Sequence, residues 1–168
     1  MKKILILLLI MPAILISATH KDFIDYLVEL SDYESKKPVG ADATFGKIIM
    51  INATKTYTND EKEVTATIHV SNQSSTVMPL YRSGLVMKKD NVVIKVIWIK
   101  GFLTQISYDI RKHRGTMTVF LHSREKKGDV MGTMTFSLKN VSMWEGVLIV
   151  KRFNLAGIKR QIEKIEND

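Results

Sequence analysis

The chain contains no cysteine in its 168 residues. Disulfides, thiolate metal ligands, a cysteine nucleophile and lipid attachment through an N-terminal cysteine are therefore all excluded. An exported domain of this composition has to be stabilised by its apolar core alone.

Sequence motifs of common enzymes are also missing. The chain has no G-x-S-x-G, no H-E-x-x-H and no glycine-rich phosphate loop. Its histidines, His20, His69, His113 and His122, never occur as a pair with metal-ligand spacing on one helix. No two carboxylates are placed by the sequence to act as a glycosidase pair. We therefore predict that the protein is not an enzyme and needs neither a metal nor another cofactor.

The first residues are typical of an export signal. Two lysines follow Met1, an apolar run covers 4–16, and small residues around Ala18 precede the first polar segment. We predict a signal peptide at 1–18, cleavage after Ala18, and a periplasmic or secreted protein. An uncleaved anchor remains the alternative, although the run is shorter than the ~20 residues that a spanning helix needs. Apart from that, we expect membrane contact to be transient at most.

The charge of the chain is strongly positive. The formal net charge is +8, and removing Lys2 and Lys3 with the signal leaves +6. The cations gather at successive turns of the middle of the chain, at 88–89, 111–114 and 124–127. A basic protein suggests a nucleic-acid partner, but the aromatic residues lie within apolar runs and the protein is expected to be exported. We therefore predict no nucleic-acid binding.

An amphipathic helix is predicted over 19–37. Its apolar residues recur at steps of three and four, and Lys36, Lys37 and Pro38 supply cations and a breaker at its end. The stripe consists of Phe23, Tyr26, Leu27, Leu30 and Tyr33.

Residues 45–154 are predicted to form an antiparallel sheet, because the hydrophobic period changes to two and short turns recur regularly. Residues 39–44 are interpreted as a linker, and no proline follows Pro79 to interrupt a strand. A short C-terminal helix is expected at 155–168. The predicted strands are 45–57, 61–71, 76–87, 91–100, 102–111, 115–123, 130–139 and 146–154.

The stretch 91–111 is the longest apolar run outside the N-terminus, and we expect it at the centre of the sheet. Gly101 divides it, either as a tight hairpin turn with Lys100 or as a bulge in one bent strand. If Gly101 is only a bend, the turns at 88–91 and 112–115 would lie at one end of the sheet.

The predicted fold is a single α+β domain at 19–168. The N-terminal helix packs on a strongly curved antiparallel sheet, or a partly closed β-barrel, of about seven or eight strands. This layout resembles that of periplasmic lipoprotein-carrier proteins, in which a curved half-barrel holds acyl chains under helices. The resemblance is one of architecture, and it implies an apolar cavity.

Two features suggest where a ligand would bind. Flexible methionines suit a cavity for acyl chains, although they also fill ordinary cores, and a basic rim suits an anionic head group. Our first hypothesis is therefore an exported, non-catalytic carrier of lipid or another anionic amphiphile. The alternative is an envelope interaction or assembly module that holds a protein partner through its basic turns or an exposed strand edge, and an enzyme ranks third. The candidate apolar lining is Trp98, Met117, Met134 and Phe136, and the candidate head-group residues are Arg111, Lys112 and Arg114.

Overall fold

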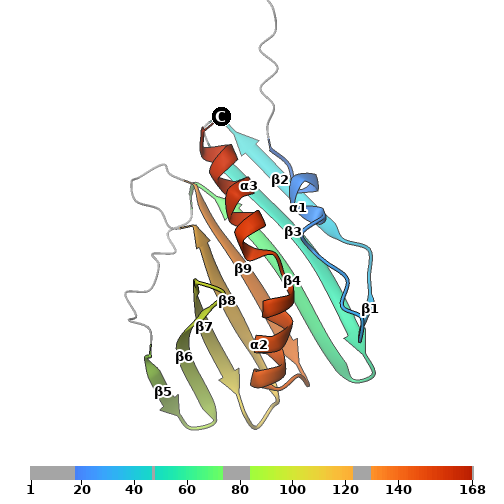
Figure 1. The fold of residues 1–168 in the computed structure, drawn as a ribbon, viewed down its shortest axis with the longest axis vertical. Coiled ribbons are helices and arrows are strands. Elements are labelled where there is room, and N and C mark those ends of the chain that lie inside the picture. Colours follow the sequence, from blue (N-terminus) through green and yellow to red (C-terminus); the bar gives the residue numbers. More distant parts are fainter. Residues whose placement is uncertain (1–17, 47, 74–83, 123–129, 168) are drawn as a thin grey trace, which may run out of the picture.

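One open antiparallel sheet of nine strands dominates the computed structural model, which describes residues 18–46, 48–73, 84–122 and 130–167 (Figure 1). The strand order is β1-β3-β4-β9-β8-β7-β6-β5, and β2 pairs with β3 next to β1. The antiparallel sheet is confirmed, but it does not close into a barrel and has nine strands instead of seven or eight. Its strands are β1 (Glu34–Ser35), β2 (Val39–Phe45), β3 (Ile48–Asn59), β4 (Lys62–Ser71), β5 (Val86–Lys89), β6 (Val92–Ile99), β7 (Phe102–Asp109), β8 (Arg114–His122) and β9 (Met131–Lys139).

The apolar stretch 91–111 forms the hairpin of β6 and β7. Lys100 and Gly101 have φ values of 50° and 82°, the left-handed values of a two-residue hairpin turn, so Gly101 marks a turn and not a bend. The hairpin lies next to the edge strand β5, whereas β4, β9 and β8 form the middle of the sheet. Our expectation of a central position was therefore wrong. The apolar residues on both faces of β6 have another cause, because Val96 packs with Leu103 and Phe120 in a small cluster on the face of the sheet that the helices do not cover.

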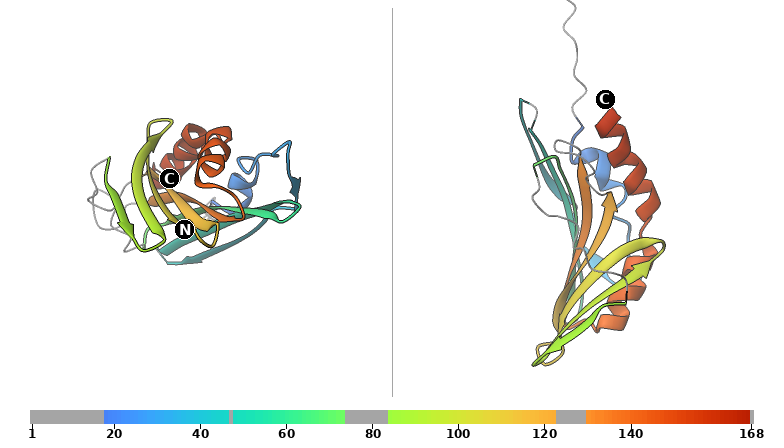
Figure 2. Two further views of the ribbon diagram at one scale, coloured as in Figure 1. Left: turned by 90° about the horizontal axis from the view of Figure 1, so that it is seen from below. Right: turned by 90° about the vertical axis from the view of Figure 1, so that its left-hand side faces the viewer.

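The helices all lie on one face of the sheet, which curves around them (Figure 2). They are α1 (Lys21–Ile24), α2 (Met143–Arg152) and α3 (Leu155–Asn167). Beneath them the core contains Phe136 and Tyr57, whose rings meet that of Phe153 edge to face at centroid distances of 4.9 and 6.4 Å. We call the opposite face of the sheet the outer face.

The outer face is mostly polar. Threonine hydroxyls pair across its strands, as in Thr54 with Thr67 at 3.1 Å and Thr56 with Thr65 at 3.3 Å. The residues that alternate with these threonines on β4 point into the core, as the sequence pattern predicted. All of them are fully buried: Val64, Ala66, Ile68 and Val70.

The predicted helix over 19–37 is wrong, because α1 has only four residues. Downstream of it, backbone carbonyls accept hydrogen bonds from side chains of β3 instead of from amides one helical turn later. Lys55 Nζ donates to Leu27 O at 3.2 Å, and the Tyr57 hydroxyl donates to Val28 O at 2.8 Å. The apolar stripe still reaches the core, since Phe23, Leu27 and Leu30 are buried. Tertiary hydrogen bonds have therefore replaced helical ones.

The secondary structure predicted for two further segments, on either side of the main run of strands, was also wrong. Residues 39–44 belong to strand β2, and the predicted strand 146–154 is mostly helix α2. The Ser142 side chain caps α2 by accepting a hydrogen bond from the Glu145 amide at 3.1 Å. Helix α3 confirms the predicted C-terminal helix. The helices α2 and α3, and not an N-terminal helix, cover most of the concave face (Figures 1 and 2).

Several predicted features lie outside the described residues. They are residues 1–17 of the signal segment, most of the predicted strand 76–87, and the basic turn at 124–127. Within the part of the chain that the structure describes, no helix is long and apolar enough to cross a membrane.

Candidate functional site

Three of the predicted lining residues lie together in the packed core. Met117 is paired with Phe136 and Val119 with Met134 across β8 and β9, and all four side chains are fully buried on the face that the helices cover. Helix α2 lies directly on them, since a Cβ atom on Gly146 would be 2.7 Å from Cε of Met117. Three of the four predicted lining residues are therefore neighbours, and in this structure their side chains fill the core instead of enclosing a cavity.

Trp98 is separated from these residues. It lies on the outer face beside Leu103, which it faces across β6 and β7, and 59% of its surface is exposed. The predicted apolar lining is thus divided between the two faces of the sheet.

The predicted basic residues gather at one end of the sheet, around the turn between β7 and β8. Arg111 and Lys112 lie in this turn, where their backbone amides each donate to Asp109 Oδ1 at 3.0 Å. The turn between β5 and β6 lies at the same end, because Ile110 N donates to Asn91 O at 2.9 Å. The two turns share an end because Gly101 makes a hairpin turn between them, contrary to our expectation that a bend was required.

An open depression of about 720 Å³ lies on the outer face at this end of the sheet. It contains two predicted site residues, Lys112 and Arg114, and also Lys139, which sequence reasoning missed. Its lining comes from β4, β6, β7, β8, β9 and the adjoining turns: Glu63, Val92, Ser107, Asp109, Lys112, Arg114, Gly115, Thr116, Ser137, Leu138, Lys139 and Asn140.

Two exposed cations stand side by side in the depression. Arg114 pairs with Lys139 across β8 and β9, and Thr116 pairs with Ser137 one step further along the same strands. Among the described residues neither Arg114 nor Lys139 forms an ion pair within 4.0 Å. Each has one acid as its other cross-strand neighbour, Asp109 and Glu63 respectively.

The acid beside Arg114 is occupied elsewhere. One oxygen of Asp109 accepts the two backbone amides of the turn, and the other lies 3.9 Å from Lys112 Nζ. Arg114 and Lys139 therefore present donors to solvent, next to the hydroxyls of Thr116 and Ser137. Such a set of donors suits an anionic oxygen group.

The backbone around the depression is held by long-range hydrogen bonds. The Tyr108 hydroxyl donates to Val141 O at 2.9 Å, and Asn140 N donates to His113 O at 2.8 Å. Gly115 allows this close packing, since a Cβ atom there would lie 2.7 Å from the Tyr108 ring. The strand ends that carry Arg114 and Lys139 are therefore fixed relative to each other before any ligand binds.

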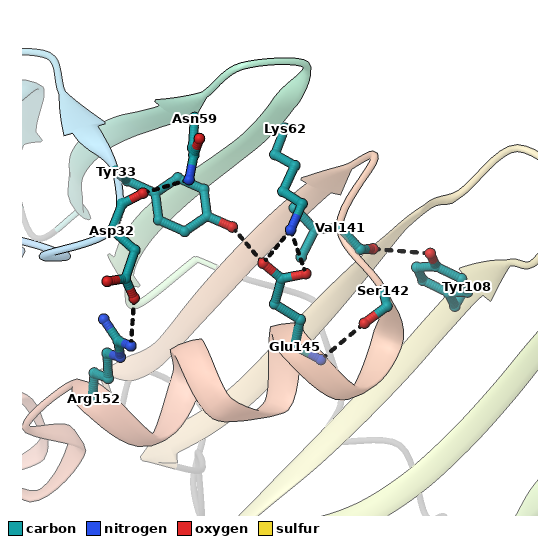
Figure 3. A network of polar contacts seen from close by, with 9 residues as sticks. All are labelled: Asp32, Tyr33, Asn59, Lys62, Tyr108, Val141, Ser142, Glu145 and Arg152. Atoms are coloured by element: carbon teal, nitrogen blue, oxygen red, sulfur yellow. Dashed lines mark hydrogen bonds and ion pairs between the residues drawn. The ribbon is translucent and has the colours of Figure 1, made fainter.

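A second depression, of about 550 Å³, lies where the N-terminal segment meets the hairpin of β3 and β4. Of its three acids, Asp32 is bound by Arg152 at 2.9 Å, and this hydrogen bond holds the pKa of the Asp32 carboxyl below its ordinary value, whereas Glu34 and Asp60 lie on the exposed rim. Nearby, Glu145 accepts from the Tyr33 hydroxyl at 2.9 Å and from Lys62 Nζ at 3.0 Å (Figure 3). These groups satisfy one another, so the network connects elements and offers no open ligand site.

Metal-ligating side chains do not cluster in the described ranges, where no group of three or more His, Asp or Glu residues could hold an ion. The chain matches no protein-family model, no curated protein and no solved structure in the three comparisons made. The helix-covered face and the outer face of the sheet are therefore the source of any functional assignment.

Proposed function

We propose that the protein is an exported interaction module that binds an anionic group of its partner over Arg114 and Lys139. The observation that carries this proposal is the pair of adjacent cations, free of ion pairs in the described structure, in the depression of about 720 Å³. The export signal predicted at 1–18 supports the compartment in this proposal. The dense packing around Met117 and Phe136 favours this module over a preformed lipid cavity.

Binding is a better fit than catalysis at this site. No histidine lines the depression, and the chain has no cysteine, so the imidazole and thiol groups that serve most often as catalytic base and reactive nucleophile are missing there. Of its two acids, Asp109 already holds the turn. The other acid, Glu63, lies beside Lys139 across β4 and β9, and the remaining polar side chains are hydrogen-bond donors and hydroxyls, which can recognise an anion.

The expected affinity for one small anion is low. Each charge-assisted hydrogen bond contributes roughly 1.5 to 3 kcal/mol, and solvent and salt screen exposed groups strongly. Two or three such bonds correspond to dissociation constants on the order of 1 mM. A biological partner should therefore carry several anionic groups, or add contacts along the hydroxyl-rich strands beside the cations.

Titration with inorganic phosphate, followed by backbone NMR of the mature chain, tests the proposal. The resonances of Gly115, Thr116 and Ser137 should shift first and saturate together. The double variant R114Q/K139Q should lose these shifts. The matched control R160Q/K164Q, which removes one arginine and one lysine from the exposed side of α3, should retain them. Shifts spread evenly over the lysines, or shifts that persist in R114Q/K139Q, would contradict the proposal.

A lipid carrier remains the second candidate, because three of its predicted lining residues lie together beneath α2 and α3. Those helices would have to move away to admit an acyl chain. Native mass spectrometry of the mature protein, purified from its own envelope and also after incubation with lipid vesicles, tests this function. A bound amphiphile of discrete mass supports the carrier, and a bare protein mass under both conditions argues against it.

A further inference from the structure

An exposed stripe runs along the side of α2 that faces away from the sheet. Trp144 and Leu148 are 67% and 45% exposed, and with Lys151 they follow positions i, i+4 and i+7. The opposite side of the same helix is buried in the core through Val147, Ile149 and Val150. Two large apolar side chains therefore project from a helix whose packing needs neither of them.

The backbone of the helix that carries the stripe is held at both ends. Lys151 Nζ lies 6.0 Å from the centre of the Trp144 ring, and Ser142 caps the first turn of the helix. At the other end, Lys100 Nζ donates to Lys151 O at 3.2 Å and to Phe153 O at 3.0 Å. Binding would therefore not have to order the helix backbone, which lowers its entropic cost.

The charges on α2 and on the strands beside it are mostly positive. Strands β5 and β6 rise beside α2 (Figure 2), and their residues on the helix side include Val86, Lys88 and Lys95. The only acid in α2, β5 and β6 is Glu145. It is turned toward Tyr33 and Lys62 and therefore does not offset these lysines (Figure 3).

We propose that this stripe docks the protein reversibly on an anionic membrane surface, with Trp144 and Leu148 in the interfacial region and Lys88, Lys95 and Lys151 at the head groups. Tryptophan and lysine are both favoured at the membrane interface, where the lysine stem lies along apolar surface and its ammonium group reaches the head groups. Lysine is depleted from protein–protein interfaces, so this composition fits a lipid surface better than a protein partner.

The docking stripe and the proposed anion site lie on opposite faces of the sheet. A protein held on a membrane through α2 would point Arg114 and Lys139 away from the bilayer. The two proposals can therefore fail separately, since one concerns α2 and the other the outer face.

The two tryptophans of the chain provide a direct test, because Trp98 is exposed on the outer face and Trp144 on the helix side. The variants W98F and W144F of the mature chain each retain one fluorophore. They would be mixed with phosphatidylglycerol vesicles that carry bromine on their acyl chains. The emission of Trp144 in W98F should shift to the blue and be quenched, whereas Trp98 in W144F should show neither change. Equal quenching of both, or of neither, would overturn the proposal.

Vesicle co-sedimentation of further variants separates docking from general attraction between a basic protein and anionic lipid. W144A/L148A should weaken binding to phosphatidylglycerol vesicles at least about tenfold. F45A is the matched control, since it removes a 71% exposed aromatic side chain from β2, and it should bind as the parent does. Unchanged binding by W144A/L148A, or loss of binding by R114Q/K139Q instead, would overturn the proposal. Equal binding to phosphatidylcholine vesicles would contradict the role of the lysines.

Discussion

Tyr33 and Glu145 are 112 residues apart in the sequence and are joined by a hydrogen bond of 2.9 Å from the tyrosine hydroxyl to the carboxylate. Lys62 donates to the same carboxylate at 3.0 and 3.2 Å. The N-terminal segment, the start of β4 and the first turn of α2 therefore meet at one acid (Figure 3). Arg152, at the other end of α2, binds Asp32 of the same segment.

Replacing Tyr33 by phenylalanine should destabilise this junction. Tyr33→Phe removes the hydroxyl donor to a charged acceptor that is partly exposed, so the free energy of unfolding should fall by about 1 kcal/mol. Urea denaturation followed by circular dichroism measures the change. Tyr26→Phe is the matched control, because no hydrogen bond of the Tyr26 hydroxyl occurs among the described residues. Equal losses in both variants would show that the bond to Glu145 contributes nothing specific.

The N-terminal segment shows why its helix could not be predicted correctly. Periodicity placed Phe23, Leu27 and Leu30 on one buried side, and all three are buried. The carbonyls of Leu27 and Val28 would accept hydrogen bonds from amides of the predicted helix only if no other donor competed for them. Those donors are Lys55 and Tyr57, which come from a strand nearly thirty residues later. A local pattern contains no information about such partners.

The misassigned helix α2 carried a signal that could have been used. Its residues Val147, Ile149 and Val150 favour a strand when composition alone is considered. However, Ser142 followed three residues later by Glu145 is the pattern of a helix start, and the amide of Glu145 does donate to the Ser142 hydroxyl. The cap distinguishes helix from strand where apolar runs do not.

The candidate site was only partly predictable. Arg114 was chosen because cations cluster at its turn, and it does line the depression. Its neighbour Lys139 is 25 positions later, and the two meet only because β8 and β9 pair in one particular register. Strand alternation predicts the face of Lys139 but not this register, which depends on the whole sheet.

Removing the Ser142 cap should destabilise α2. Ser142→Ala leaves the Glu145 amide without its side-chain acceptor, and the expected cost is about 1 kcal/mol in the free energy of unfolding. Ser142→Asp supplies another good acceptor and should restore most of the loss. Thermal denaturation of the two variants provides the comparison. If the alanine and aspartate variants melted at the same temperature, the side-chain cap would not stabilise the helix.

Protonation of His69 should make the free energy of unfolding depend on pH in the mildly acidic range. Burial lowers the pKa of His69 below its ordinary value of about 6.5, and its Nδ1 lies 2.8 Å from Asn52 Oδ1. As the pH falls through about 6.5, the unfolded chain binds this proton before the folded protein does. Stability should therefore decline from there down to the folded pKa, by about 1.4 kcal/mol for each unit of difference.

Two measurements check the role of His69. NMR titration of its imidazole resonances should give a midpoint below the ordinary value. In His69→Gln, the decline of the melting temperature between neutral pH and pH 5 should become smaller. A parent and variant with the same pH dependence would assign that decline to other groups.

Protonation of three carboxyl groups in stronger acid should weaken the contacts that hold the N-terminal part of the chain. Hydrogen bonds from Lys55, Arg152 and His20 lower the pKa values of Glu29, Asp32 and Asp42 respectively. Their contribution is present above the unfolded values near 4 and is lost as the pH falls through the lower folded values.

The variant Asp32→Asn separates this acid effect from general unfolding. Asparagine cannot ionise, so part of the contribution is absent at every pH and the decline of stability below pH 4 should be shallower than in the parent. Asp25→Asn is the matched control, because Asp25 lies in the same segment and forms no ion pair within the described residues. Urea denaturation between pH 6 and pH 3 measures all three proteins. Since Arg152 belongs to α2, a parent whose stability stayed constant over this range would show that its bond to Asp32 does not help to hold the N-terminal segment against the helix.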